Sequence, residues 1–349
     1  MNWVFDVYGT AADNVYACGN KGAMFHYDGN DSNHWEYVEM GSGSPITTVW
    51  ASDNGTMYAA GHDGKIWQEA GGSWSSMSSG TTEDLYGLGA FGQVIHAVGA
   101  KGTIKRLSGS SWSSVASVVI LRDPESLAPQ DTLSLQVDFP SVITVSEYFI
   151  GGAYYLPDFD GDLTGLAGTD GMVLALDEEP ELYDWRLRPV GTDQFAVAEW
   201  ISAATSSVVN IEDNYLGTSE GWIFHISEDN TGKLVIEQMS PDITTDSGSG
   251  IRDMWLDQDS NLYFVTDDGD MGFQSSDYNF RENIGFRDIF PVTQSGLTSI
   301  WGSDRDNIFM SGFTENSLIQ ASVALTDTTA ELDFTVVPLE FPSKGGKSI

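Results

Sequence analysis

The sequence predicts an all-β fold made of small antiparallel sheets that repeat along the chain. The first observation is a phrase that returns with fixed spacing: an aromatic residue, a polar turn, a short apolar strand and then a glycine. Copies run from Tyr8 to Gly19, from Trp50 to Gly61 and from Trp301 to Gly312, each eleven residues from aromatic to glycine. The second observation is that helical periodicity is nearly absent, so short strands and turns account for the pattern.

The strands of each unit follow in order from this phrase. In the first unit we expect strands at 3–8, 15–18, 23–27 and 35–40, separated by turns rich in glycine, aspartate and asparagine. The second unit runs from about 46 to 77, and the third from 85 to 115. The Gly-x-x-Gly turns between the second and third strands supply positions with positive φ, which glycine adopts at little cost.

The same turn aligns the middle of the chain, beyond an insert at about 116–150. The anchor positions of the repeat are Gly19, Gly61, Gly99, Gly168, Gly217, Thr266 and Gly312. The intervals between them are 42, 38, 69, 49, 49 and 46 residues, and only the interval of 69, which holds the insert, is out of line. We therefore count seven units.

Seven units of four antiparallel strands predict a seven-bladed β-propeller. A small twisted sheet with two apolar faces cannot bury both alone, whereas radial stacking buries each face against a neighbour. We expect a single domain spanning 1–349, with a C-terminal tail at 339–349. Because the chain starts at a first strand and ends after a fourth, we expect no strand shared between its ends, and closure through apolar packing of the first and last sheets.

Some of these phrases resemble a known repeat type. Residues 301–303 with 307–309, and residues 58–61 with 64–67 and 72–74, resemble the bacterial propeller repeats related to photosystem II assembly factors and to neuraminidase-type repeats. The resemblance covers the first three units and the last one. It implies a propeller fold and, usually, protein binding, but no single reaction, because propellers host many functions.

The composition restricts the partners. The 349 residues carry a formal charge of −36, from 51 acidic and 15 basic side chains. Such an acidic protein repels phosphate backbones and anionic lipid, so we expect no nucleic-acid partner. The first residues lack the basic and apolar regions of a signal peptide. No apolar run reaches the roughly 20 residues of a membrane span, so we expect no membrane insertion.

One acidic turn resembles a calcium loop. Asp158, Asp160 and Asp162 alternate around Gly161, and Ca²⁺ takes six to eight oxygen ligands from such turns. Leu166 and Ala167 stand where the loop pattern places a later acidic ligand, and an acidic hairpin turn explains the same residues. Calcium is therefore the one candidate metal, and the sequence calls for no other cofactor.

The tryptophans divide into two groups. Trp50, Trp255 and Trp301 share one repeat position, which is typical of residues packed between blades, and Trp35, Trp74 and Trp112 share another. Trp185, Trp200 and Trp222 lie at neither position, so we take them as candidate binding residues, since tryptophan contacts ligands through a large apolar face.

Catalytic motifs are missing from the sequence. The five histidines show no metal-binding spacing, and no Gly-x-Ser-x-Gly elbow occurs. Cys18, the single cysteine, lies on a predicted strand, where a small buried residue is the expected role. No arginine lies in the Phe/Tyr-Arg-Ile-Pro motif that sialidase-like hydrolases share.

The sequence therefore favours a non-enzymatic propeller that serves as a structural or protein-interaction subunit of a larger assembly. A phage virion protein, of the tail or associated with the capsid, is the most concrete version, and its polar tail with Lys344 and Lys347 is expected to dock on a partner. The alternative is a secreted or cell-surface propeller that binds protein or glycan. A sialidase-like glycan hydrolase ranks third. The expected location is the virion or the extracellular space.

Overall fold

The computed structural model describes most of the chain outside its middle part. The described residues are 2–30, 35–91, 94–100, 103–114, 121–122, 150–151, 163–169, 172–177, 185–189, 195–197, 208–212, 215–218, 221, 223–228, 234–238, 249–278, 285, 287–313, 315–326 and 328–341. In them the all-β prediction is confirmed. The helical segments among these residues are two single 3-10 turns, η1 (Asn20–Gly22) and η2 (His62–Gly64).

The strands form several four-stranded antiparallel sheets, each a meander in chain order. The first three sheets contain β1 (Val4–Ala11), β2 (Asn14–Gly19), β3 (Met24–Tyr27) and β4 (Glu36–Tyr37); β5 (Ile46–Ala51), β6 (Met57–Gly61), β7 (Lys65–Ala70) and β8 (Ser73–Ser78); and β9 (Leu85–Phe91), β10 (Val94–Gly99), β11 (Thr103–Ser108) and β12 (Ser111–Ser114). Within the predicted insert, β13 (Leu121–Arg122) pairs in parallel with β14 (Ile150–Gly151).

The later sheets repeat the same order. They contain β15 (Leu163–Thr169), β16 (Met172–Asp177), β17 (Trp185–Pro189) and β18 (Phe195–Val197); β19 (Val208–Glu212), β20 (Tyr215–Thr218), β21 (Ile223–Glu228) and β22 (Leu234–Gln238); β23 (Ile251–Leu256), β24 (Leu262–Thr266), β25 (Asp270–Gln274) and β26 (Arg287–Pro291); and β27 (Leu297–Asp304), β28 (Asn307–Gly312), β29 (Ser317–Leu325) and β30 (Ala330–Pro338).

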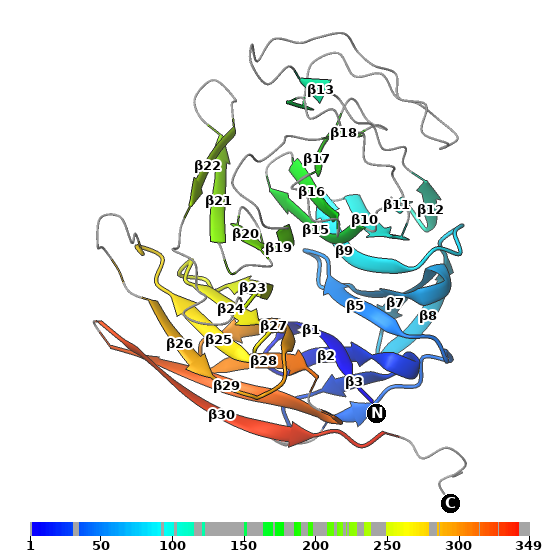
Figure 1. The fold of residues 1–349 in the computed structure, drawn as a ribbon. Coiled ribbons are helices and arrows are strands. Elements are labelled where there is room, and N and C mark those ends of the chain that lie inside the picture. The colour runs from blue at the N-terminus through cyan, green and yellow to red at the C-terminus, as the bar shows by residue number, and fades with distance from the viewer. Residues whose placement is uncertain are drawn as a thin grey trace, which may run out of the picture.

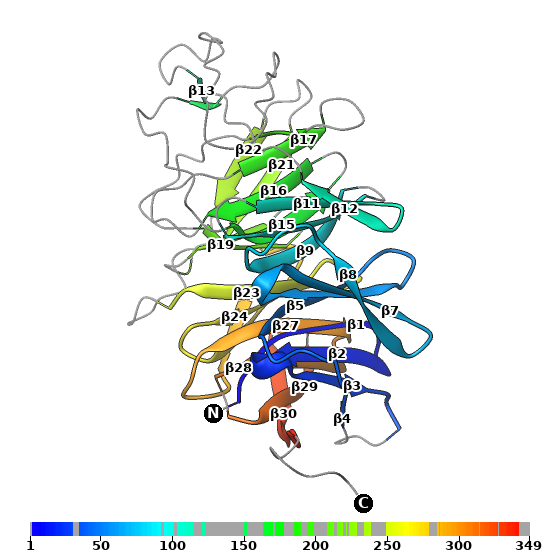
Figure 2. The ribbon, with the colours of Figure 1, turned by 90° about the vertical axis from the view of Figure 1, so that its right-hand side faces the viewer.

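The first strands of the sheets lie next to one another. Strand β1 contacts β5, and the contacts continue through β9, β15, β19, β23 and β27, which contacts β1. Figure 1 shows these strands toward the middle of the molecule and the last strands, such as β8, β22 and β30, toward its rim. In the side view of Figure 2, the first three sheets lie one above the other. In the described part of the chain β1 pairs only with β2, so the two ends share no sheet, as expected.

The apolar core lies between neighbouring sheets. Residues of the first and last sheets, including Val4, Phe25, Phe309 and Val337, belong to one cluster of buried side chains. Phe341, beyond β30, packs edge-on against Phe25 with ring centroids 4.8 Å apart. This packing joins the two ends of the chain. Further clusters lie between the first and second sheets and between the second and third.

Hydrogen bonds at one repeat position also join the sheets. The Asp6 carboxylate accepts the N–H of Val49, on the next sheet, at 2.8 Å. Asp253 accepts the N–H of Ile300, again on the next sheet, at 2.8 Å. Each of these carboxylates follows a β-bulge in the first strand of its sheet.

The same position closes the contact between the last sheet and the first. Ser299 Oγ accepts the N–H of Val7 at 3.3 Å and donates to the Asp6 carboxylate at 2.7 Å. The polar side chain at this position therefore bonds the sheet that follows, at each of these three interfaces. We call Asp6, Asp253 and Ser299 the hub residues.

Candidate functional site

A groove lies over the outer part of the second sheet, beside the connections that enter and leave it. Its volume is about 1140 Å³, and its lining comes from strands β7 and β8 and from residues 39–41 and 79–82. Trp74, Met77 and Met40 supply apolar surface, while Ser76, Ser78 and Thr81 are among its hydroxyl groups. This volume exceeds the 300–1,000 Å³ typical of small-molecule pockets, and it suits an extended segment.

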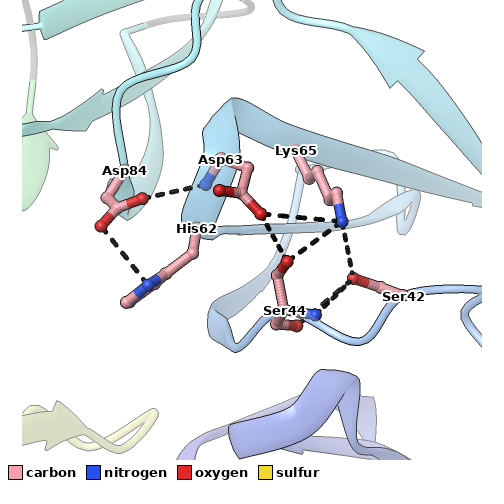
Figure 3. Close-up of polar contacts among 6 residues, drawn as sticks. All are labelled: Ser42, Ser44, His62, Asp63, Lys65 and Asp84. Atoms are coloured by element: carbon pink, nitrogen blue, oxygen red, sulfur yellow. Dashed lines mark hydrogen bonds and ion pairs between the residues drawn. The ribbon is translucent and has the colours of Figure 1, made fainter.

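A polar cluster lies beside the groove and shares Lys65 with it (Figure 3). The Lys65 ammonium group donates to Ser42 Oγ and Ser44 Oγ, both at 3.2 Å, and lies 3.9 Å from the Asp63 carboxylate. Ser44 Oγ donates to the same carboxylate at 2.5 Å. The cluster therefore fixes the turn η2 against the connection that enters the second sheet.

The other side of the cluster holds the connection that leaves the second sheet. The Asp84 carboxylate accepts the backbone N–H of Asp63 at 2.9 Å and lies 3.3 Å from Nδ1 of His62. Figure 3 shows His62 and Asp84 on the opposite side of η2 from Lys65. The Ser44 hydroxyl group donates to Asp63 and not to His62, so these residues do not form the nucleophile–base pair of a serine hydrolase.

In the Gly-x-x-Gly turn of the second sheet, Gly61 and Gly64 are required for different reasons. A side chain at Gly61 would clash with the carbonyl oxygen of Pro45, which accepts the N–H of His62 at 3.1 Å. Gly64 has φ of +64° and a side chain there would clash with the Thr81 carbonyl. The first glycine of the turn therefore permits close approach, and only the second meets the prediction of a positive φ.

The hub residues form a second polar site, at the middle of the molecule. Burial raises the pKa of the Asp253 carboxyl group to about 7, and the negative charge of Asp6 adds to this effect. Burial also raises the pKa of Asp6, against hydrogen bonds from Val49, Ser299, Thr48 and Val7 that lower it. Perturbed carboxyl groups of this kind occur at active sites and in structural networks alike. Here each carboxylate accepts the N–H of the next residue of its own strand, Val7 or Met254, and a further N–H from the following sheet.

The predicted repeat tryptophans lie between sheets. Trp255 and Trp301 are buried, and their rings lie against Gly302 and Gly9 of the next sheet. Trp50 is partly buried and packs against the cluster between the second and third sheets. The anchor residues Gly19, Gly61, Gly99, Gly217 and Gly312 approach the start of a neighbouring strand. The alignment at Gly168 is wrong: this residue lies on β15, the first strand of its sheet, and it precedes the second strand, β16, instead of following it. Glycine spacing alone does not distinguish the two turns on either side of a second strand.

The predicted ligand-binding residues lie mostly outside the described residues. This applies to Asp158, Asp160 and Asp162 of the calcium loop and to Trp200 and Trp222. Trp185 begins β17, and nothing is described of its side chain. Among the described residues, no group of three or more histidine, cysteine, aspartate or glutamate side chains has the geometry of a metal site. Calcium binding remains a prediction.

Sequence reasoning missed both the hub residues and the groove. A signal for the hub was available: Asp6, Asp253 and Ser299 each lie two residues before the aromatic residue of the repeat. No comparable signal existed for the groove. Residues 64–67, 74 and 76–82 of its lining belong to the β7–β8 hairpin and the residues next to it, but residues 39–41 come from the preceding unit and join them only through the packing of the sheets.

Similarity to solved structures identifies the fold, whereas comparisons of the sequence find no match. No protein-family model and no curated protein matches the sequence. Among solved structures, YCF48 from Cyanidioschyzon merolae is similar with a TM-score of 0.58 and 14% identity, over 89% of this chain and 92% of that one. YCF48 bound to D1 peptide is similar with a TM-score of 0.61 and 13% identity, over 94% of each chain.

A third similar structure is the WD40 β-propeller domain of Doa1, with a TM-score of 0.59 and 12% identity over 91% of this chain and 92% of that one. The fold is therefore that of the β-propeller repeat proteins, which agrees with the resemblance seen in the repeated phrases. Across the described residues, no helix has the length and apolar character needed to cross a membrane.

Proposed function

We propose that this protein is a seven-bladed, non-enzymatic β-propeller that binds a protein partner within a larger assembly. The propeller fold is common to many interaction modules, and one of the similar structures is YCF48 bound to a peptide. The observation that carries the proposal is the groove over the second sheet, which has a volume of about 1140 Å³ and mixes apolar and hydroxyl groups. Seven units counted in the sequence, and the contact of β27 with β1, support a closed ring.

The lining of the groove favours a peptide over a glycan. Glycan stacking needs an exposed aromatic face, but Trp67 is buried and Trp74 stands edge-on against Tyr16, with ring centroids 5.3 Å apart. Met40 and Met77 adapt to varied apolar side chains, which suits a peptide. The comparisons give no support to a virion role, so the proposal names the partner only as protein. A secreted or cell-surface propeller remains the alternative.

A peptide display library tests the proposal. Peptides enriched on the wild-type protein should lose at least tenfold in affinity for Ser76→Arg, because Ser76 lines the groove and is exposed on β8. Ser73→Arg is the matched control, since Ser73 is exposed on the same strand outside the groove lining. Enrichment of glycans instead of peptides on an array, with loss in Ser76→Arg, would favour the alternative. Equal binding by both variants would reject the groove.

A further inference from the structure

The last strand of the chain offers an unusually long free edge. Strands β29 and β30 pair over nine residues each, from Ser317 with Pro338 to Leu325 with Ala330. In Figure 1 this hairpin runs along the rim of the molecule. Strand β30 is the outermost strand of its sheet, and within the described residues no strand pairs with its other side. Exposed edges of this length are ready templates for another strand.

The backbone groups on this edge follow from the pairing. Leu339 N–H donates to Asn316 on the β29 side, whereas Ala330 N–H donates to Asp288 of β26 on the other side. Hydrogen bonding alternates along an antiparallel strand, so the even-numbered residues of β30 direct their N–H and C=O groups away from β29. Leu332, Phe334 and Val336 thus present these groups at the free edge.

The side chains of β30 divide into an apolar row and an acidic row. Phe334 and Val336 are 37% and 50% exposed, and Ile289 on the neighbouring β26 is 36% exposed. These are three of the five large apolar side chains that are exposed in the described residues. On the opposite face, Glu331 and Asp333 are exposed. Strand β30 carries no lysine or arginine, so all of its charged side chains are acidic.

Charge decides which chain can pair with this edge. A second copy would bring its own Glu331 and Asp333 to the interface, in a protein with a formal charge of −36. Like charges on paired strands destabilise the pair, and opposite charges stabilise it. A strand that alternates apolar and basic residues complements both rows at once.

We propose that the free edge of β30 binds an extended protein segment with alternating apolar and basic residues, which adds to the last sheet as a further strand. The inference shares with the proposed function only the kind of partner, a protein segment, and it uses a different surface from the groove. The main-chain bonds come from Leu332, Phe334 and Val336. Specificity comes from the acidic row formed by Glu331 and Asp333.

Fluorescence anisotropy with a labelled nine-residue peptide of alternating valine and lysine provides the test. The wild-type protein should bind this peptide at least tenfold more tightly than the same peptide with glutamate in place of lysine. Binding should weaken strongly between 50 mM and 500 mM salt, because the charges are exposed. A peptide with N-methylated valines, which lacks N–H groups on one edge, should bind at least tenfold more weakly.

Two variants of the protein separate strand addition from simple attraction. Val336→Pro removes an edge N–H group that β29 does not use, so folding is retained while binding falls at least tenfold. Val336→Ala keeps that N–H group and should lose less than fivefold. The double variant Glu331→Lys, Asp333→Lys should reverse the preference between the lysine and glutamate peptides, which tests the acidic row. If Val336→Pro fails to fold, the N-methylated peptide still tests strand addition.

Several outcomes would overturn the proposal. These are equal affinity for the two peptides, undiminished binding of the N-methylated peptide, or undiminished binding by folded Val336→Pro. Dimerisation of the wild-type protein that Val336→Pro abolishes would assign the edge to a second copy instead. The groove variant Ser76→Arg should bind the lysine peptide as the wild-type protein does, so that failure of the groove and failure of the edge are told apart.

Discussion

The carboxyl group of Asp253 should make the stability of this protein depend on pH in a direction opposite to that of an ordinary surface aspartate. Its pKa is raised from 3.8 to about 7 in the folded protein, first by burial and then by the charge of Asp6. Between these two values the folded protein binds a proton that the unfolded chain does not. Raising the pH from about 4 through about 7 therefore removes stability, and the loss is complete above pH 7.

The size of the effect follows from the two pKa values. Each pKa unit corresponds to about 1.4 kcal/mol, so the ceiling is about 4 kcal/mol for Asp253. The side chain is partly exposed, and solvent screening reduces the figure, so we expect about 2–4 kcal/mol. Asp253→Asn cannot ionise and should lose this dependence. It also loses one backbone acceptor bond, at a cost of about 1 kcal/mol at every pH.

Urea unfolding followed by tryptophan fluorescence, at pH 5, 6, 7 and 8, measures the difference. Asp253→Asn should be less stable than the wild-type protein at pH 5 and equal or more stable at pH 8. Asp53→Asn is the matched control, because it removes one exposed carboxylate from a turn outside the hub. Curves of the wild-type protein and Asp253→Asn that stay parallel over the whole range would refute the reasoning.

Three further predictions concern packing. Trp301→Ala should destabilise the protein by about 3–5 kcal/mol in the same urea assay, because the buried ring fills the interface over Gly9, and a loss below about 1 kcal/mol would contradict this packing. Gly64→Ala should lower the free energy of unfolding by at least about 2 kcal/mol, because the added methyl group clashes with the Thr81 carbonyl. Gly71→Ala, also at positive φ but with open space around it, should lower it by about 1 kcal/mol. Equal losses would rule out the clash with Thr81. Cys18 is fully buried and burial raises the pKa of its thiol, so it should react with a thiol reagent only after unfolding, and rapid labelling of the folded protein would count against this placement.

The repeat could be predicted from the sequence because its spacing records the turn chemistry. The eleven-residue phrase located β2, β6 and β28, together with the turns before them, since a glycine that approaches a neighbouring carbonyl has few substitutes. The last strand of each unit was harder. The strand expected at 35–40 is only β4 (Glu36–Tyr37), which pairs with β3 at two positions, whereas β30 pairs with β29 over nine residues.

The candidate sites depended on contacts that no single stretch of sequence contains. The groove needs Met40 and Met77 on different units, and the polar cluster joins Ser44, Asp63 and Asp84 from three connections. The free edge of β30 is different, since alternating Glu331, Asp333, Phe334 and Val336 are visible in the sequence. Its position as an outermost strand is not, because pairing partners are decided by the fold.

The interface between the last and first sheets has the same kind of hydrogen bond as two interfaces between consecutive sheets. In each, a hub side chain accepts a backbone N–H from the sheet that follows. Asp6 holds the sheet that follows it, Asp253 does the same, and Ser299 holds the sheet with which the chain began. Opening the molecule at that junction thus means breaking bonds of the same kind as at the other two interfaces. The interface between the last sheet and the first therefore has no missing hub hydrogen bond at which thermal unfolding would begin.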